Sequence, residues 1–271
     1  MGVELSPGGT PPRNRPAGGG EPITTQHLLV RYAKRGKMRF ASQLDVARAF
    51  ERGVRRADLP IAYSVGFTPH PKISYAGGVP TGVASEAEYL SLTLTRPAEA
   101  DAVRERLNAA LPDGIDVIAV TEDSGGLPAS RLTASEWQMA LPGLPPDNVV
   151  PVVDEFLALT EAPVERMTSK GLRRMDARAA VVSLGVSRLP GGRPPGARPT
   201  GEPDGIGRAG GEHELPVGTM LHMVVRHTVP AVRPDDVLNA LRDVSDVFPA
   251  GQPLTTRLAQ GSLGESGVVQ P

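Results

Sequence analysis

The apolar positions in the first half of the chain follow the spacing of strands and helices in turn. Short apolar or alternating runs, typical of strands, occupy residues 27–33, 37–40, 61–64, 72–75, 86–95 and 115–121. Helical spacing occupies residues 42–59 and 98–111. Residues 27–33 and 37–40 count as one strand region, and residues 61–64 and 72–75 are pieces of another around a loop. The order is then βαββαβ, that of a ferredoxin-like unit, and we expect one over residues 23–125.

The first predicted helix carries signals at both of its ends. Ser42 and Asp45 have the spacing of a capping box, in which the serine hydroxyl accepts a backbone N–H and the carboxylate favours the positive end of the helix. Pro60 ends the helix because it lacks a backbone donor. The residues that we expect on its buried face are Leu44, Ala47, Phe50, Val54 and Ala57.

The second half of the chain runs through a similar order. Strands are predicted at residues 136–141, 164–168, 220–227 and 255–260, and helices at residues 148–160 and 234–244. Residues 178–184 lie between the second of these strands and an insert rich in glycine and proline. We therefore expect an α+β protein of tandem ferredoxin-like units, the second over residues 130–260.

Glycine and proline are concentrated in segments with too few apolar residues to form a core. Residues 1–22 and 188–216 are accordingly predicted to be a disordered tail and a disordered insert, and residues 261–271 a C-terminal tail. No apolar stretch approaches the roughly 18 residues that a membrane-spanning helix needs. We expect a cytoplasmic protein that does not bind membranes.

The 271-residue chain contains no cysteine. This excludes disulfides, thiolate nucleophiles and cysteine-ligated zinc or iron–sulfur sites within it. The histidines at positions 27, 213, 222 and 227 are scattered, and the pair at 222 and 227 would face opposite sides of a strand. We expect no metal site.

Positive charge is concentrated in one part of the chain. Residues 31–72 hold ten basic and three acidic side chains, a net charge of +7, whereas the whole chain has a net charge of −1. A concentrated positive field attracts polyanions even when the total charge is near zero.

Four arginines of the first predicted helix share one face because their spacing follows the helical repeat. They are Arg48, Arg52, Arg55 and Arg56, and we call them the arginine ridge. With Arg39 and Lys72 they supply the forked and flexible donors that phosphate binding requires. The same pattern also fits a solvated helix face supported by a Glu51–Arg55 pair.

The loop after this helix presents a histidine on a stiff backbone. Pro69 fixes its own φ and Pro71 biases His70 towards an extended conformation, while Gly66 permits a turn. His70 beside Lys72 can act as a general base, a phosphate ligand or a stacking surface, or can simply cap a carbonyl in a structural loop. The other loop contacts that we expect are Tyr63, Ser64 and Phe67.

Glu86 and Glu88 lie two residues apart on one face of a predicted strand. Paired carboxylates can perform acid–base chemistry, but this spacing is more typical of a solvated strand edge. No glycine-rich phosphate loop, HExxH motif or GxSxG motif occurs in the chain.

The chain resembles the radical SAM-linked protein family, a domain of unknown function, densely over roughly residues 27–125 and more loosely beyond, through Asp176 and Arg178. The resemblance rests on RFxSxxDxxRxFERxxRRxxLPxxYSxGFxPHPKxS over residues 39–74 and GVASxxEY over residues 82–89. Beyond the helix and the loop it adds Ser85, Glu88 and Tyr89 as family-motif residues. The chain departs from the family at Gln43, Asp58 and Ser91, where relatives commonly have His, Gly and Asp.

The resemblance implies a stand-alone form typical of actinobacteria and an association with RNA or translation. It also implies a radical SAM enzyme as partner. S-adenosylmethionine and the [4Fe–4S] cluster would belong to that partner, because this chain has no thiolates to hold a cluster and no cofactor of its own is expected.

The sequence is therefore consistent with three functions. The first is an accessory protein that binds RNA or presents a substrate to a radical SAM enzyme in RNA or ribosome modification. The second is a metal-independent RNA-processing endonuclease in which His70 acts as base and Lys72 stabilises the phosphorane. The third is a protein-interaction module whose basic face meets an acidic partner.

Overall fold

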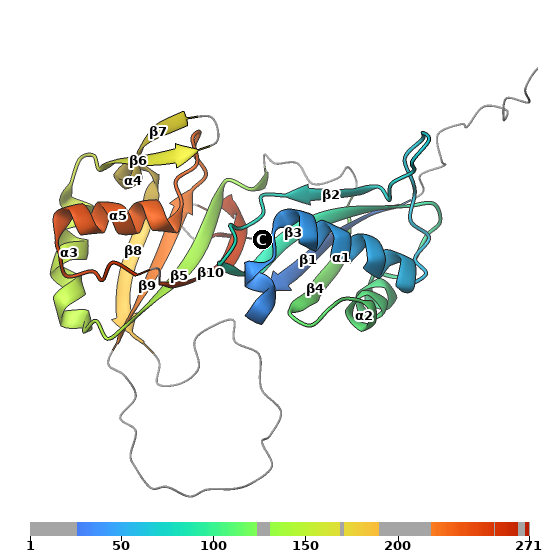
Figure 1. The fold of residues 1–271 in the computed structure, drawn as a ribbon, viewed down its shortest axis with the longest axis horizontal. Helices are drawn as coiled ribbons and strands as arrows, with labels where there is room; N and C mark the ends of the chain where they lie inside the picture. Colours follow the sequence, from blue (N-terminus) through green and yellow to red (C-terminus); the bar gives the residue numbers. More distant parts are fainter. Residues whose placement is uncertain are drawn as a thin grey trace, which may run out of the picture.

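The computed structural model describes residues 26–123, 131–168, 171–189, 218–251, 253–264 and 269–270. Over these ranges the protein is an α+β structure built on one nine-stranded mixed sheet (Figure 1). Its strands are β1 (Gln26–Lys34), β2 (Ile73–Ala76), β3 (Ala84–Leu94), β4 (Ile115–Glu122), β5 (Ala134–Pro142), β8 (Val181–Arg188), β9 (Gly218–Arg226), β10 (Leu254–Leu263) and β11 (Val269–Gln270). A separate hairpin pairs β6 (Pro163–Thr168) with β7 (Gly171–Asp176).

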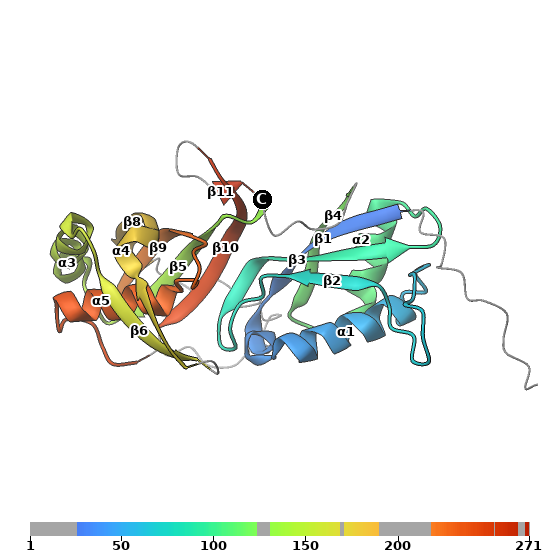
Figure 2. The same ribbon diagram turned by 90° about the horizontal axis from the view of Figure 1, so that it is seen from above.

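The helices are η1 (Gly36–Phe40), α1 (Gln43–Arg56), α2 (Ala100–Ala110), α3 (Pro146–Ala158), α4 (Ala177–Ala180) and α5 (Pro234–Val244). Figure 2 shows α1 and α5 on the same side of the sheet. One side of the molecule is therefore helical in both halves.

Strand β3 connects the two halves of the sheet. The main strand order is β4-β1-β3-β10-β5-β9-β8, with β2 beside β3 and β11 beside β10. Along one edge β3 pairs with β1 over most of its length. Its other edge is divided, because β10 pairs in parallel only at Ala84 and Ser85, and β2 pairs at residues 89–92. The two halves thus share very few backbone ladder positions.

The first half has a core between β1, β3, α1 and α2. Leu28, Leu90, Phe50 and Leu107 have no exposed surface, so both helices pack against the same sheet face. The Tyr32 ring meets Phe50 edge to face, with centroids 4.8 Å apart. Burial of this apolar surface supplies most of the driving force for folding this half.

Helix α1 begins at the predicted Ser42 cap and ends at Arg56, earlier than the predicted end at residue 59. The Ser42 hydroxyl accepts from the Asp45 backbone N–H at 3.2 Å, and an Asp45 carboxylate oxygen accepts from the Ser42 backbone N–H at 3.1 Å. The hydrogen bond from the Ser42 hydroxyl lowers the pKa of Asp45, as does its backbone hydrogen bond. The predicted buried face needs one correction, because Leu44 is 58% exposed and Val46 and Ala49 are buried instead.

The second half has its own core. Met139, Phe156, Leu221, Val237 and Leu241 are buried between β5, β9, α3 and α5. Strand β10 pairs with β5, and β8 pairs with β9.

Four predicted elements differ from the structure. The strand expected at residues 61–64 is reduced to two isolated bridges, Ile61 with Leu94 and Tyr63 with Pro71. Residues 37–40 form the 3-10 helix η1, because the Arg35 carbonyl accepts from the Met38 backbone N–H and closes a turn. Residues 164–168 were expected within the second unit, but β6 pairs only with β7 outside the main sheet. Residues 181–188 form the edge strand β8. The sequence pattern around residues 178–184 indicated only the first part of this strand.

The predicted tails and insert lie mostly outside the described residues. Residues 1–22 and 190–216 belong to that part of the chain. The C-terminal tail expected over residues 261–271 is wrong at its start, because Gly261–Leu263 continue β10, where Gly261 pairs with Ala134.

Candidate functional site

The arginine ridge is exposed along α1. Arg48, Arg52, Arg55 and Arg56 all lie at the surface, opposite the buried Phe50 and Val54. None of the four takes part in an ion pair between described residues, although Arg48 helps to lower the pKa of Asp45, after the Ser42 hydrogen bonds. The ridge is therefore a row of guanidinium groups open to an external anion.

The predicted loop is a hairpin that follows α1 at the end of the helix where Arg55 and Arg56 lie (Figure 1). Tyr63 pairs with Pro71 across its base, and the Ser64 backbone N–H donates to the His70 carbonyl at 2.9 Å. The Ser64 hydroxyl accepts from the His70 backbone N–H at 3.0 Å. We call residues 63–71 the His70 hairpin.

The tip of the His70 hairpin exposes apolar side chains. Phe67 is fully exposed and Val65 is 61% exposed, while Gly66 takes a φ of +147° that strains other residues. The His70 imidazole is also exposed and has no hydrogen-bond partner among the described residues. The backbone of His70 is thus fixed by Ser64, but no group orients its ring for proton transfer.

The structure brings only part of the predicted phosphate-binding set to the surface. Lys72 is half-buried, and Tyr63 packs against the first core. Arg39 is also half-buried, with its guanidinium 4.6 Å from the centre of the Phe40 ring. The open positions are the four ridge arginines and the hairpin tip.

The family-motif residues of β3 lie at a different place, between the two halves. Glu88 is 1% exposed and pairs with Arg257 of β10, and Ser85 is fully buried beside it. Tyr89 is 4% exposed and its hydroxyl has no hydrogen-bond partner in the described structure. The interpretation of Glu86 and Glu88 as a solvated edge is therefore wrong for Glu88, which is buried against Arg257 of β10, whereas Glu86 is half-buried and forms an ion pair with Arg35.

Arg257 is the centre of a buried polar network. Its guanidinium donates to the Gly77 carbonyl at 2.8 Å, to the Gln260 side chain at 2.9 Å and to Glu88. Burial lowers the pKa of the nearby Lys34, and the positive charge of Arg257 adds to this effect while Glu88 opposes it. The network fixes the orientation of Arg257 from both halves of the chain.

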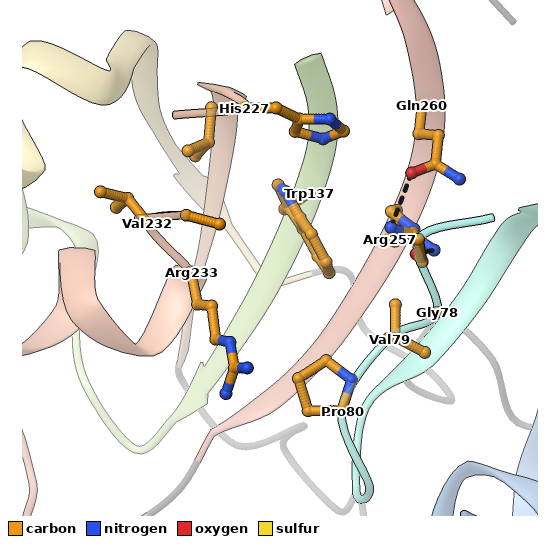
Figure 3. A pocket seen from close by; sticks show the side chains of 12 residues that line it. Gly78, Val79, Pro80, Trp137, His227, Val232, Arg233, Arg257 and Gln260 are labelled. Atoms are coloured by element: carbon orange, nitrogen blue, oxygen red, sulfur yellow. Dashed lines mark hydrogen bonds between the residues drawn. The ribbon is translucent and has the colours of Figure 1, made fainter. Parts of the chain in front are cut away.

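A pocket of about 350 Å³ opens beside this network (Figure 3). One wall comes from residues 77–80 of the first half. The others come from the second half: Trp137, Val225, His227, Ala231, Val232, Arg233, Arg257 and Gln260. We call it the inter-half pocket. Trp137 stands between the two walls, with the Arg257 guanidinium 5.4 Å from its ring centre.

Sequence reasoning missed the inter-half pocket because its residues come from four distant segments. One signal was available, since Arg257 is a charged residue in the middle of the strand predicted at residues 255–260. A charge in a buried strand requires a partner, and that partner marks a tertiary contact.

His227 lies at the upper rim of the pocket (Figure 3). Its Nδ1 lies 2.7 Å from the Leu132 carbonyl oxygen, and its Nε2 lies 2.7 Å from the Ser135 hydroxyl. The carbonyl can only accept, so Nδ1 carries the proton and a neutral ring accepts at Nε2. Partial burial lowers the pKa of His227, consistent with a neutral imidazole.

The described residues hold no cluster of three His, Asp or Glu side chains that could bind a metal ion. In the same ranges no helix is long and apolar enough to cross a membrane.

A protein-family model matches most of the chain. The model of an uncharacterised protein family conserved in bacteria, DUF2344, matches residues 27–234. The chain belongs to the DUF2344 family. No curated protein matches the chain. The match runs from β1 to the start of α5 and so includes the arginine ridge, the His70 hairpin and most of the inter-half pocket.

Two departures from the family resemblance have clear positions within the DUF2344 fold. Asp58 ends α1 with a φ of 47°, in the left-handed region that glycine adopts without strain. Gln43 lies at the start of α1 with its side chain against Gly78, where an added Cβ would be 2.2 Å from the Gln43 Oε1. The Gln43 side chain is therefore directly behind the glycine wall of the inter-half pocket.

Proposed function

We propose that this protein is an accessory RNA-binding protein, which binds RNA or presents it to a radical SAM enzyme in RNA or ribosome modification. The proposal that the protein binds RNA rests on the arginine ridge. Four guanidinium groups lie exposed on one helix face and take no ion-pair partner from the described protein. Rows of arginine on this scale are suited to successive phosphates of a nucleic acid.

The His70 hairpin supports single-stranded RNA over other polyanions. Aromatic side chains that stack on unpaired bases must be exposed, and Phe67 at the hairpin tip is fully exposed. The exposed His70 ring lies on the same hairpin. An acidic protein partner would need the ridge but would have no base to stack on Phe67.

We also propose that each half of the chain is a ferredoxin-like unit. The order βαββαβ holds for β1, α1, β2, β3, α2 and β4, with the strand order β4-β1-β3-β2. The order of β5, α3, β8, β9, α5 and β10 is the same, with the strand order β10-β5-β9-β8. Elements β6, β7 and α4 are an addition between α3 and β8 in this scheme.

The radical SAM partner is proposed from the family resemblance. The chain has no cysteine, so a cluster held by thiolates would belong to the partner polypeptide. Co-purification of the protein from its native cells with and without the arginine ridge would identify the partner. Absence of any radical SAM enzyme from both samples would reject this part of the proposal.

The RNA proposal is tested by measuring the affinity for a short single-stranded RNA as a function of salt. Reversing both Arg52 and Arg55 to Glu should lower the affinity at least tenfold. It should also reduce the log–log salt slope by about 1.4, because each phosphate contact contributes about 0.7 for single strands. Both side chains are exposed, so the free energy of unfolding should change by only about 0.5 kcal/mol.

A matched control reverses Arg188 and Arg226, two exposed arginines of the second half. This control carries the same change of net charge but leaves the ridge intact, so its RNA affinity should stay close to that of the wild type. Equal losses in the two variants would show that net charge, rather than the ridge, determines binding.

The proposed stacking of an RNA base on Phe67 is tested by Phe67→Ala. Loss of one stacked base should weaken RNA binding by about 1–3 kcal/mol and leave the salt slope unchanged, because no phosphate contact is removed. Val65→Ala is the control at the same hairpin tip. An unchanged affinity in Phe67→Ala would show that the hairpin does not contact bases.

A further inference from the structure

The inter-half pocket has the size and composition of a site for a small ligand. Its volume of about 350 Å³ lies within the range of about 300–1,000 Å³ that small-molecule pockets occupy. It lies between the two halves of the chain, a place where ligand sites commonly occur.

The interior of the inter-half pocket is largely apolar. Trp137 is only 7% exposed, and Val79 and Val232 contribute buried aliphatic side chains from opposite walls. Pro80 continues the wall that carries Val79 (Figure 3). A flat apolar ring is the ligand group that such a space accommodates best, because it can contact the indole and the aliphatic walls together.

The wall at residues 77–78 consists of backbone. Gly77 takes a φ of +40°, which disfavours other residues, and its carbonyl is held by Arg257. A side chain at Gly78 would collide with Gln43. The two glycines therefore accommodate the turn and the Gln43 side chain behind it, and at these two positions the pocket is lined by main chain.

Arg233 is the cation at the pocket that forms no close ion pair among the described residues, although its positive charge opposes the rise that burial causes in the pKa of the neighbouring Asp235. Arg257 is neutralised by Glu88, and Asp236, on the first turn of α5, is paired with Arg166. The Arg233 side chain is exposed, extends along the pocket in Figure 3 and forms no ion pair with any described residue. Its guanidinium can bind a carboxylate or a phosphate with two parallel hydrogen bonds.

We propose that the inter-half pocket binds a small ligand made of a planar ring and one anionic group. The ring would lie against Trp137 between Val79 and Val232, and the anionic group would meet Arg233. This site is separate from the arginine ridge and does not depend on RNA binding. The anionic group can be a phosphate, as in a mononucleotide, or a carboxylate, as in an aromatic acid.

The chain itself provides the reporter for this site. Trp137 is its only tryptophan, so intrinsic tryptophan fluorescence responds to occupancy of the inter-half pocket without a label. Two matched pairs of probes separate the ring from the charge. AMP and adenosine test a phosphate on a purine, and nicotinate and nicotinamide test a carboxylate on a pyridine.

At least one anionic probe should change the fluorescence saturably and bind at least tenfold more tightly than its uncharged counterpart. Whether this is AMP or nicotinate distinguishes the phosphate from the carboxylate. If neither AMP nor nicotinate gives a saturable change up to millimolar concentration, the proposal is rejected.

Variants of Arg233 test whether its guanidinium binds the anionic group of the ligand. Arg233→Gln should remove the advantage of the anionic probe, and Arg233→Lys should keep part of it. Arg226→Gln, an exposed arginine outside the pocket lining, is the control and should bind as the wild type does. An affinity for the anionic probe that Arg233→Gln leaves unchanged would also reject the proposal.

The same variants separate this proposal from the RNA proposal. Arg233→Gln should bind single-stranded RNA as the wild type does, since the ridge is intact. Conversely, reversal of Arg52 and Arg55 should leave the fluorescence response to the anionic probe unchanged. Circular dichroism of each variant checks that the fold is retained.

Discussion

Glu88 of β3 and Arg257 of β10 form a buried ion pair that joins the two halves of the molecule. Their side chains are 2% and 5% exposed, and the strands that carry them pair at only two positions, Ala84 with Thr256 and Ser85 with Arg257. The other oxygen of Glu88 accepts from the Val79 backbone N–H at 3.2 Å. The pair therefore holds both the sheet junction and one wall of the inter-half pocket.

Replacing Glu88 with Ala should destabilise the protein by about 3–5 kcal/mol, because Arg257 would remain buried without a counter-charge. Chemical denaturation measures this change. Asp101→Ala is the control, since Asp101 forms an ion pair with Arg104 at 3.3 Å while 90% exposed, and pairs of this kind contribute at most about 1 kcal/mol. Similar losses in both variants would contradict the structural role of the buried pair.

His70→Ala distinguishes the binding function from the nuclease alternative. An accessory RNA-binding protein should cleave no RNA as wild type, and the variant should bind RNA more weakly. A general base instead contributes about 10²–10⁴-fold to the rate and little to affinity. Incubation with cellular RNA, with and without divalent metal, measures cleavage. Metal-independent cleavage by the wild type that is lost in His70→Ala would overturn the binding function.

Gly114→Ala should lower the free energy of unfolding by about 3 kcal/mol, because the position combines two costs. Its φ of +90° is strained for residues with a Cβ, and the added Cβ would lie 2.7 Å from the Arg35 carbonyl oxygen. Gly36→Ala has a positive φ of +54° but no atom within 4 Å, so it should cost only about 1 kcal/mol. Thermal denaturation of the two variants compares these costs. Equal losses would show that the contact with Arg35 relaxes freely.

The stability of the protein should fall as the pH drops below about 6.5, with His227 as one contributor. Partial burial lowers the pKa of His227 in the folded state, so the unfolded chain binds this proton more tightly. The contribution is fully present above pH 6.5 and is lost as the pH falls through the lower, folded pKa. Urea denaturation between about pH 7.5 and 5.5 measures the slope, which should be smaller in His227→Gln. An identical slope in the variant would exclude His227 as a contributor.

Local sequence determined the first helix and its surroundings. The Ser42–Asp45 box, the end of α1 before Pro60 and the exposure of the arginine ridge all follow from spacing within a few residues, so they could be predicted without tertiary information. Leu44 shows the limit of that reasoning. It was expected on the buried face, but at about 100° per residue it lies on the side of α1 opposite Val46 and Phe50, with the arginine ridge, and is exposed.

Strand pairing was decided only by the tertiary structure. The pattern of residues 164–168 predicts a strand but does not say whether its partner is the main sheet or β7. The continuous sheet likewise depends on β3 meeting β10, two strands about 170 residues apart in sequence, as the Ser85–Arg257 separation of 172 shows. Hydrogen-bonding capacity is the same along every strand, so periodicity alone cannot identify the partner.

The inter-half pocket is the clearest product of the tertiary structure. In the sequence, Glu88 looked like a solvated carboxylate and Arg257 was only a charge within a predicted strand. Folding buries them against each other and places Gly77, Trp137 and Arg233 around one cavity. The helical repeat alone sets which positions of one helix are exposed, so the sequence determined the arginine ridge. The cavity requires long-range packing of separate segments, so only the tertiary structure determined the inter-half pocket.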